Sequence, residues 1–353
     1  MRPAREYLYN LVTGKIRGPI AVFLRVFLFL LSLIYGLVVI ILVAFYRRKP
    51  VRLGAKVISI GNITLGGTGK TTFVEYLSRL LSSQGKKVAV LSRGYHRNTS
   101  KQGVQSLGDE PAMLQKKLTG VAVIVNKNRI KGASKAIKDY AAQILILDDG
   151  FQQWRIFKDL EIVTIDAADP FGNRRLLPAG FLREPLSALR RADIFVLTQV
   201  NLVKDTVELR DKLKCLNPQA LIIETIHQPD GFTGVSEPDE LLSVDGLRGK
   251  NVLIFSGIGN PQGFENSIAG LGINIAKSFR FSDHHDYAQA DIDGVIQEAR
   301  RLNLDTIITT HKDAIKISEL KIQGAGILAL NIKLGITKNE AEFSRRLLKL
   351  YSL

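Results

Sequence analysis

A short glycine-rich run carries the residues best suited to chemistry in this chain. Its members are Gly66, Gly67, Thr68, Gly69, Lys70, Thr71 and Thr72. An apolar run at 57–60 precedes it, and a stretch with helical periodicity at 73–81 follows it. Glycines let backbone N–H groups curl around phosphate oxygens, and a helix N-terminus adds partial positive charge. The pattern predicts a loop that binds a nucleotide triphosphate, with Lys70 at the β- and γ-phosphates and Thr71 on Mg²⁺.

The match to the pattern G-x-x-x-x-G-K-[ST] is incomplete, because Thr64 stands where the first glycine is expected. An ordinary glycine-rich turn after a strand is the alternative. The strand-like and helix-like flanks favour the phosphate-binding interpretation.

Two adjacent carboxylates, Asp148 and Asp149, end the apolar run at 143–147. A carboxylate at a strand end commonly completes the Mg²⁺ site of a phosphate-binding loop. Adjacent carboxylates repel each other unless a cation lies near them. A solvated turn is the alternative, and the phosphate-binding loop favours the metal site.

Two further acidic motifs have both a plain and a chemical interpretation. Asp109 precedes Glu110 and Pro111, where it caps a helix or acts as a base toward a substrate hydroxyl. The run Asp-His-His-Asp-Tyr at 283–287 contains His284 and His285. A carboxylate–imidazole pair that accepts a proton fits this run better than zinc, because no cysteine or third histidine has ligand spacing. A solvated polar loop is the third possibility.

Two stretches after predicted strands are candidates for substrate contacts. Arg93 and Tyr95 follow an apolar run at 88–91, and strand ends are where open α/β sheets bind ligands. Arg93 holds an anion or packs structurally. The long stretch at 170–185 mixes glycine, proline, apolar and basic residues, which suits a phosphorylated amphiphile.

The whole chain limits the class of protein. It has 353 residues, one cysteine and a net charge of +16, so a disulfide framework is excluded and an anionic partner is indicated. Guanine recognition is disfavoured, because Arg129 stands where the Asn-Lys-x-Asp motif needs a carboxylate.

The N-terminal region predicts a membrane helix. Residues 26–46 carry no charge and are mostly Leu, Ile, Val and Phe. As a helix they extend about 31 Å, which matches a bilayer core. Basic residues flank the segment on both sides, so it either crosses the membrane or lies in the inner leaflet. A buried soluble helix is the alternative.

Further along, apolar runs alternate with amphipathic stretches. The alternation predicts an α/β fold: a P-loop NTPase-type, mostly parallel sheet domain, a second smaller α/β domain, and the N-terminal membrane helix. We expect a membrane-anchoring segment at 1–50, a kinase domain at 51–228 and a second domain at 229–353. The polar stretch at 228–240 is expected to connect the domains. A final helix at 339–350 is assigned to the second domain, and its packing back on the first domain is the alternative.

Six motifs in order resemble the tetraacyldisaccharide 4'-kinase family, the lipid A 4'-kinases of Gram-negative bacteria. They are Gly-Asn-x-x-x-Gly-Gly-x-Gly-Lys-Thr from 61, Ser-Arg-Gly-Tyr from 92, Gly-Asp-Glu-Pro from 108, Asp-Asp-Gly-Phe-Gln from 148, the stretch at 170–185, and Asp-His-His-x-Tyr from 283. The resemblance runs from the membrane helix to about residue 335. The missing first glycine is itself a feature of this family.

The resemblance implies transfer of the γ-phosphate of ATP, with Mg²⁺, to the 4'-hydroxyl of tetraacyldisaccharide 1-phosphate, forming lipid IVA. It implies Lys70 and Asp149 as catalytic residues, Asp109 as base and His284 as its partner, with His285 an open alternative. It implies a metal group of Thr71, Asp148, Asp149 and Gln152, and substrate contacts from Arg93, Tyr95, Arg183 and Glu184.

The expected partners are the acylated glucosamine disaccharide 1-phosphate and anionic inner-membrane lipids, with no nucleic acid and no obligate protein partner. We expect the catalytic domains on the cytoplasmic face of the bacterial inner membrane, where ATP is. A membrane-associated P-loop ATPase acting as a switch or assembly factor is the alternative, and a nucleic-acid-binding ATPase is a third, suggested by the charge alone.

Overall fold

Two compact units make up the chain in the computed structural model, which describes residues 2–94, 109–236, 241–283, 285–322 and 326–350. The first unit contains residues 1–226 together with 335–353, and the second contains 227–334. The units are described here one at a time.

Two helices begin the first unit. Helix α1 (Arg2–Val12) was not expected from the sequence, and α2 (Pro19–Tyr46) is the predicted apolar helix. Helix α2 starts seven residues earlier than predicted, because Pro19 is suited to the first helical position and Arg25 is accommodated within the helix. By length and composition α2 is able to cross a membrane.

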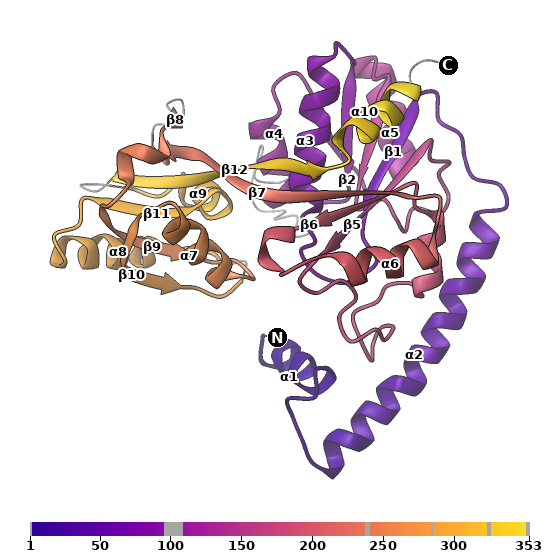
Figure 1. The fold of residues 1–353 in the computed structure, drawn as a ribbon, viewed down its shortest axis with the longest axis horizontal. Helices are drawn as coiled ribbons and strands as arrows, with labels where there is room; N and C mark the ends of the chain where they lie inside the picture. The colour runs from indigo at the N-terminus through magenta and orange to yellow at the C-terminus, as the bar shows by residue number, and fades with distance from the viewer. Residues whose placement is uncertain (1, 95–108, 237–240, 284, 323–325, 351–353) are drawn as a thin grey trace. The chain divides into compact units, whose positions relative to one another are not determined.

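Parallel strands form the sheet of the first unit, in the order β7-β6-β5-β1-β4-β2-β3. Figure 1 shows this sheet, with β1, β2, β5, β6 and β7 labelled. The pairs β6–β7, β5–β6, β1–β5, β1–β4, β2–β4 and β2–β3 are all parallel. The strands are β1 (Lys56–Gly61), β2 (Val88–Ser92), β3 (Ala122–Val125), β4 (Ile144–Asp148), β5 (Leu160–Asp166), β6 (Ile194–Thr198) and β7 (Leu221–Gly234). Strands β2, β4 and β6 are buried along their whole length, as expected where both faces of a parallel sheet are covered. The predicted α/β, mostly parallel fold is confirmed.

The helices that cover this sheet have apolar faces at helical spacing. They are α3 (Lys70–Ser83), α4 (Asp109–Lys117), α5 (Arg129–Tyr140), α6 (Val207–Leu216) and α10 (Glu340–Lys349), with 3₁₀ turns η2 (Leu186–Arg191) and η3 (Val200–Leu202). One core cluster packs α6 and η2 against β5 and β6, and another packs α5 against β2 and β4. The strands are thereby held so that their carboxyl ends share one edge.

The second unit has its own hydrophobic core and its own set of parallel strands. Its strands β9 (Asn251–Ser256), β10 (Asn274–Arg280), β11 (Thr306–Thr310) and β12 (Gly326–Lys338) pair in parallel as β10-β9-β11-β12. A short strand, β8 (Leu241–Leu242), pairs antiparallel with β7. The helices are α7 (Pro261–Gly270), α8 (Gln289–Arg301) and α9 (His311–Ile317), with the 3₁₀ turn η4 (Val244–Leu247). Helix α9 was not expected; Thr310 caps it by accepting a hydrogen bond from the N–H of Asp313 at 3.2 Å.

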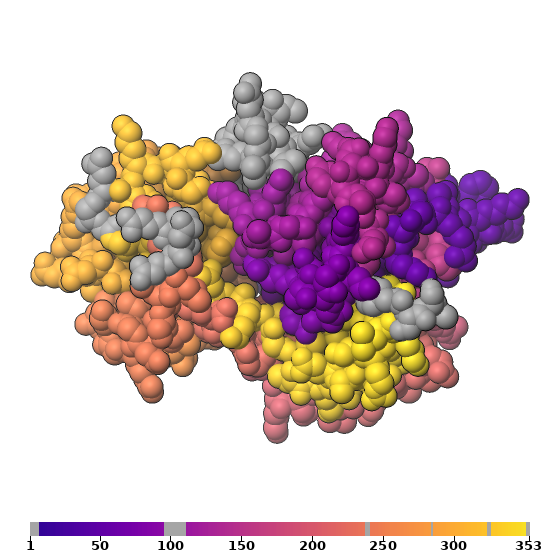
Figure 2. Space-filling view, turned by 90° about the horizontal axis from the view of Figure 1, so that it is seen from above, coloured from indigo at the N-terminus to yellow at the C-terminus, as the bar shows by residue number. Residues whose placement is uncertain are grey.

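The chain passes between the units through two strands, β7 and β12. The sequence predicted a polar connection at 228–240, but residues as far as Gly234 continue β7. The predicted second domain, 229–353, also extends beyond the second unit, which ends at 334. The reason is α10, whose Phe343 packs on Phe73 of α3 with ring centroids 5.9 Å apart. In Figure 2 yellow atoms of the C-terminal segment border purple atoms of the first unit.

A buried histidine makes the stability of the second unit dependent on pH. Within the described residues, His227 Nε2 is buried without a hydrogen-bond partner. Burial, and then the charge of Lys312, hold the pKa of His227 below its ordinary value. The unfolded chain therefore takes up a proton below about pH 6.5 that the folded chain does not. Stability is full above that pH and falls as the pH drops toward the folded pKa.

We expect the urea midpoint of the wild type to decrease when the pH is lowered from about 7.5 to about 5.5. Over this range His227 should lower the free energy of unfolding by up to about 1.4 kcal/mol per pH unit. His227→Gln should flatten that part of the dependence, because glutamine does not titrate. Equal slopes for the two proteins across this range would contradict the assignment to His227.

Candidate active site

The glycine-rich run forms a loop between the end of β1 and the start of α3. Gly66 and Gly69 have φ of 126° and 76°, a left-handed backbone that favours glycine. Thr68 is buried, with its hydroxyl 2.7 Å from that of Thr164 on β5, and its carbonyl accepts a hydrogen bond from Thr198 on β6 at 3.2 Å. The loop is thus anchored to two strands next to the first turn of α3, where backbone N–H groups point toward the loop.

The turn after β4 lies against this loop. The N–H of Gly150 donates to the carbonyl of Ile60 at 2.9 Å, which joins the turn to β1. A Cβ on Gly61 would lie 2.5 Å from the backbone nitrogen of Phe151, so only glycine permits this approach. Asp149 itself adopts a left-handed backbone with φ of 54°. These contacts place the two carboxylates of the turn beside the phosphate-binding loop.

Asp149 is the centre of an ionic cluster. Its carboxylate accepts two hydrogen bonds from the Arg183 guanidinium, at 2.8 and 2.9 Å, and lies 3.7 Å from Lys70 Nζ. Burial alone would raise the pKa of the Asp149 carboxyl, but the positive charges of Lys70 and Arg183 hold that pKa below its ordinary value. The carboxylate is therefore ionised at neutral pH.

Asp148 is held separately from its neighbour. The side chain is buried, and its Oδ2 accepts a hydrogen bond from the hydroxyl of Ser92 at 3.3 Å. Arg129, at the start of α5, donates to the Asp148 carbonyl at 3.2 Å. The two adjacent carboxylates thus point to different partners, which reduces their mutual repulsion.

A buried carboxylate with its hydrogen-bond donors lies next to the turn. Glu184 is only 1% exposed, and its carboxylate accepts hydrogen bonds from Arg191 at 2.7 and 3.0 Å and from Trp154 Nε1 at 3.2 Å. Gln152 donates to Glu184 at 3.2 Å and accepts from Arg183 at 3.3 Å. This network fixes the side chains of Gln152 and Glu184, and Glu184 is the residue that follows Arg183.

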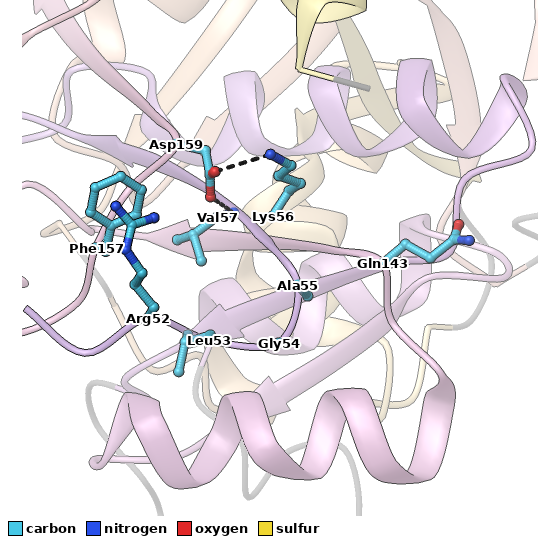
Figure 3. Close-up of a pocket in the computed structure, with 9 residues that line it drawn as sticks. All are labelled: Arg52, Leu53, Gly54, Ala55, Lys56, Val57, Gln143, Phe157 and Asp159. Atoms are coloured by element: carbon cyan, nitrogen blue, oxygen red, sulfur yellow. Dashed lines mark hydrogen bonds and ion pairs between the residues drawn. The ribbon is translucent and has the colours of Figure 1, made fainter. Parts of the chain in front are cut away.

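A hollow in the first unit lies at the opposite end of β1 (Figure 3). Lys56, at the amino end of β1, pairs there with Asp159 at 3.4 Å, and the Arg52 guanidinium lies 3.6 Å from the centre of the Phe157 ring. The phosphate-binding loop follows the carboxyl end of β1. The hollow is therefore not the place for a triphosphate held by Lys70.

Comparison with known proteins places the chain. The family model for tetraacyldisaccharide-1-P 4'-kinase matches residues 24–352. The chain belongs to the tetraacyldisaccharide 4'-kinase family. The tetraacyldisaccharide 4'-kinase of Halothermothrix orenii is 37% identical, over 89% of this chain and 88% of that protein. That of Syntrophus aciditrophicus is 35% identical, over 95% and 94%.

A solved structure agrees with this assignment. A crystal structure of LpxK from Aquifex aeolicus, in complex with ATP, matches with a TM-score of 0.73 and 29% identity, covering 93% of this chain and 99% of that chain. The predicted family and activity are confirmed: this chain is a kinase of lipid A biosynthesis.

For this tetraacyldisaccharide 4'-kinase, the structure brings together most of the predicted site residues of the first unit. Lys70, Asp149, Gln152 and Arg183 form one connected cluster, and Thr71 is buried in the first turn of α3. Arg93 is exposed just after β2. Glu184 is connected to the cluster by the hydrogen bond from Gln152. Its side chain is buried, so it is not open to a substrate as predicted.

Other predicted residues are less fully described. Asp109 begins α4, and its side chain lies outside the described part of the structure, as do Tyr95 and His284. Their roles stay predictions. Within the described residues, no group of three or more His, Cys, Asp or Glu side chains could hold a metal ion.

His285 has a partner within its own unit. Its Nε2 lies 3.0 Å from Asp291 Oδ2, and its ring stacks on Phe281 with centroids 4.8 Å apart. Lys316 Nζ donates to its backbone carbonyl at 3.1 Å. These contacts fix the position of the His285 ring within the second unit.

Sequence reasoning missed several residues that shape the site of this kinase. Trp154 and Arg191 hold Glu184, and Arg129 holds the carbonyl of Asp148. Trp154 is the only tryptophan of the chain, two residues after Gln152, which is the one signal that could have found it. Arg191 had no such signal, because it lies outside the motifs, six residues after the stretch at 170–185 ends.

Proposed function

We propose that the chain transfers the γ-phosphate of ATP to the 4'-hydroxyl of tetraacyldisaccharide 1-phosphate, forming lipid IVA. The observation that carries this proposal is the ionic cluster of Lys70, Asp149 and Arg183 beside a phosphate-binding loop, in a chain that the family model matches over 24–352. Phosphoryl transfer depends mainly on positioning and on neutralising charge, and this cluster is suited to both.

The triphosphate is proposed to bind in the loop of residues 66–72. Backbone N–H groups of the loop and of the first turn of α3 surround the phosphate oxygens, while Lys70 neutralises the β- and γ-phosphates. Arg183 offers planar donors for a phosphate oxygen or for the substrate. Its present pairing with Asp149 keeps the guanidinium directed into the site. Arg93 and Tyr95 are proposed as further substrate contacts.

The residues present fit Mg²⁺. Thr71, Asp148, Asp149 and Gln152 supply hard oxygen ligands, and protein sites for Mg²⁺ use one or two carboxylates plus substrate phosphates and water. A cluster of three carboxylates is therefore not required. The buried Asp148 carboxylate and the ionised Asp149 carboxylate supply the two. Bound Mg²⁺ would neutralise charge on the phosphates during transfer.

Asp109 is proposed as the base that accepts the proton of the 4'-hydroxyl, with His284 as its partner. Coupling to an imidazole changes the proton affinity of the pair as a whole. The support for this step is the sequence motif at 108–111, in which Asp109 is also the first residue of α4.

The segment at 1–50 is proposed to anchor the kinase to the cytoplasmic face of the bacterial inner membrane. Helix α2 exposes large apolar side chains along most of its length, and only 17% of its most apolar window is buried. The acyl chains of the substrate stay in the bilayer, so an anchor keeps the site close to them. Basic residues beside α2, among them Arg47, Arg48 and Lys49, would attract anionic lipids, at about 1 kcal/mol each.

The test is transfer of radiolabel from γ-labelled ATP to tetraacyldisaccharide 1-phosphate in detergent, with wild type and Asp109→Asn side by side. We expect labelled lipid from the wild type and a loss in kcat of about 10²- to 10³-fold in the variant. Labelled lipid with an unimpaired variant would keep the kinase and reject the base. ATP turnover without labelled lipid would instead indicate the switch ATPase.

A further inference from the structure

Helix α2 is not exposed on every side. Its buried residues include Ser32, Gly36 and Val39, which recur at helical spacing and form one narrow face. Ile34 and Leu37, on the rest of the helix, are 62% and 60% exposed. A helix that only anchored the chain would have no need of a buried face. This face therefore has a partner in the protein.

The partner is the stretch at 170–185. A Cβ on Gly36 would lie 2.7 Å from Leu176 Cδ1, so the helix lies directly against the Leu176 side chain at this position. The Arg175 guanidinium lies 5.6 Å from the centre of the Phe29 ring. Helix α1 touches the same stretch, with Tyr9 and Phe181 ring centroids 5.7 Å apart.

One hydrogen bond extends from α2 directly to a residue of the ionic cluster. The hydroxyl of Tyr35 donates to the backbone carbonyl of Arg183 at 2.8 Å. On its other side, the N–H of Arg183 donates to the carbonyl of Ile63, in the segment after β1, at 2.8 Å. The backbone of Arg183 is thus hydrogen-bonded on one side to α2 and on the other to the segment that leads into the phosphate-binding loop. Its guanidinium donates two hydrogen bonds to Asp149.

We propose that Tyr35 is a positioning residue: by holding the carbonyl of Arg183, it sets the guanidinium against Asp149, so that the kinase is fully active only when α2 is docked on 170–185. The inference rests on the proposed function for its catalytic consequence. Docking of the apolar helix is thereby linked to the arrangement of the site. Misplacement of a group by about 1 Å can cost as much as about 10²-fold in rate.

The first arm of the test measures kcat for radiolabel transfer with the full-length protein in detergent. Tyr35→Phe removes only the hydroxyl, and we expect kcat to fall about three- to tenfold, as for loss of one neutral hydrogen bond. Tyr46→Phe, at the last residue of α2, is the matched control and should change kcat by less than twofold.

A double-mutant cycle shows whether the effect passes through Arg183. In an Arg183→Ala background, Tyr35→Phe should cause no further loss, because the side chain that it positions is absent. Gly36→Val crowds Leu176 at the contact between α2 and 170–185, and should reproduce the loss without altering Tyr35. Leu37→Val, on the exposed side, is its control. Unchanged thermal unfolding temperatures would show that all these variants are folded.

A second arm does not depend on activity. Trp154, the only tryptophan, donates to Glu184, the residue after Arg183, so its emission reports on this part of the loop. Tyr35→Phe and Gly36→Val should shift its emission and increase its quenching by acrylamide, whereas Tyr46→Phe should change neither. An unchanged Trp154 signal in both variants overturns the positional claim whether or not the lipid is phosphorylated.

The outcomes separate the two proposals. An active wild type with a Tyr35→Phe variant of equal kcat would overturn the inference and keep the kinase. An equal loss from Tyr35→Phe in both backgrounds would overturn it too, because the hydroxyl would then act elsewhere. A wild type that labels no lipid rejects the proposed reaction, and the fluorescence arm then decides the inference alone.

Discussion

Asp149→Asn is expected to lower kcat for lipid phosphorylation by about 10³-fold. The carboxylate accepts two hydrogen bonds from Arg183 and lies 3.7 Å from Lys70, so its negative charge holds both cations in the site. An asparagine keeps the shape but removes the charge, which leaves two cations without their shared partner. An arginine that stabilises transition-state charge in phosphoryl transfer is worth about 10³- to 10⁵-fold, and Asp149 holds such a candidate, Arg183, in the site.

The measurement is radiolabel transfer at saturating ATP and lipid, with ATP affinity determined separately by equilibrium binding. Asp211→Asn, an exposed aspartate on α6, is the matched control and should retain wild-type kcat. A kcat for Asp149→Asn within about tenfold of wild type would show that the cluster does not contribute to the chemical step.

The second large effect is on stability. Arg191→Ala is expected to lower the free energy of unfolding by about 3–5 kcal/mol, the usual cost of removing one member of a buried ion pair. The Arg191 side chain is 8% exposed; it pairs with Glu184 at 2.7 Å and lies 3.9 Å from Glu161. It also lies over the Phe151 ring, 4.2 Å from its centre. Its loss leaves Glu184 buried without its cation.

Chemical denaturation of the full-length protein in detergent would measure this. The neighbouring Arg190 is exposed, so Arg190→Ala should change the free energy of unfolding by less than about 0.5 kcal/mol. If Arg191→Ala unfolds too readily to study, Arg191→Lys offers a milder test, because an ammonium cannot donate in the bidentate manner of a guanidinium. Equal midpoints for the Arg190 and Arg191 variants would refute the structural role.

The parts of the site that were predictable are those that depend on neighbours in sequence. The glycine positions of the phosphate-binding loop, and the carboxylates at the end of β4, have local signatures, and the structure brings Lys70 and Asp149 together. Arg191 has no such signature, and Trp154 has only its position two residues after Gln152. Their importance comes from meeting at Glu184, and which distant residues meet is decided by packing of the whole unit.

The prediction for β7 failed for a related reason. Pro229 and Gly231 are turn formers, so the stretch at 228–240 was expected to be a connection. The register of β7 with β6 ends at Glu224, so Pro229 removes no hydrogen bond from that ladder. Beyond that point β7 has β12 and β8 as neighbouring strands. No local sequence pattern reveals such pairing. The extra residues of α2 were missed because the search for an uncharged segment excluded Arg25.

The return of the last helix to the first unit has a consequence for how the chain folds during synthesis. Phe343 and Leu347 of α10 are buried, and Phe343 contacts Phe73 of the helix that follows the phosphate-binding loop. The core around α3 is therefore incomplete until nearly all of the polypeptide has left the ribosome. Residues 227–334 emerge earlier as one continuous piece. During synthesis the second unit is therefore complete before the first unit, although most of the first unit precedes it in the sequence. This is the reverse of the usual N-terminal-first order.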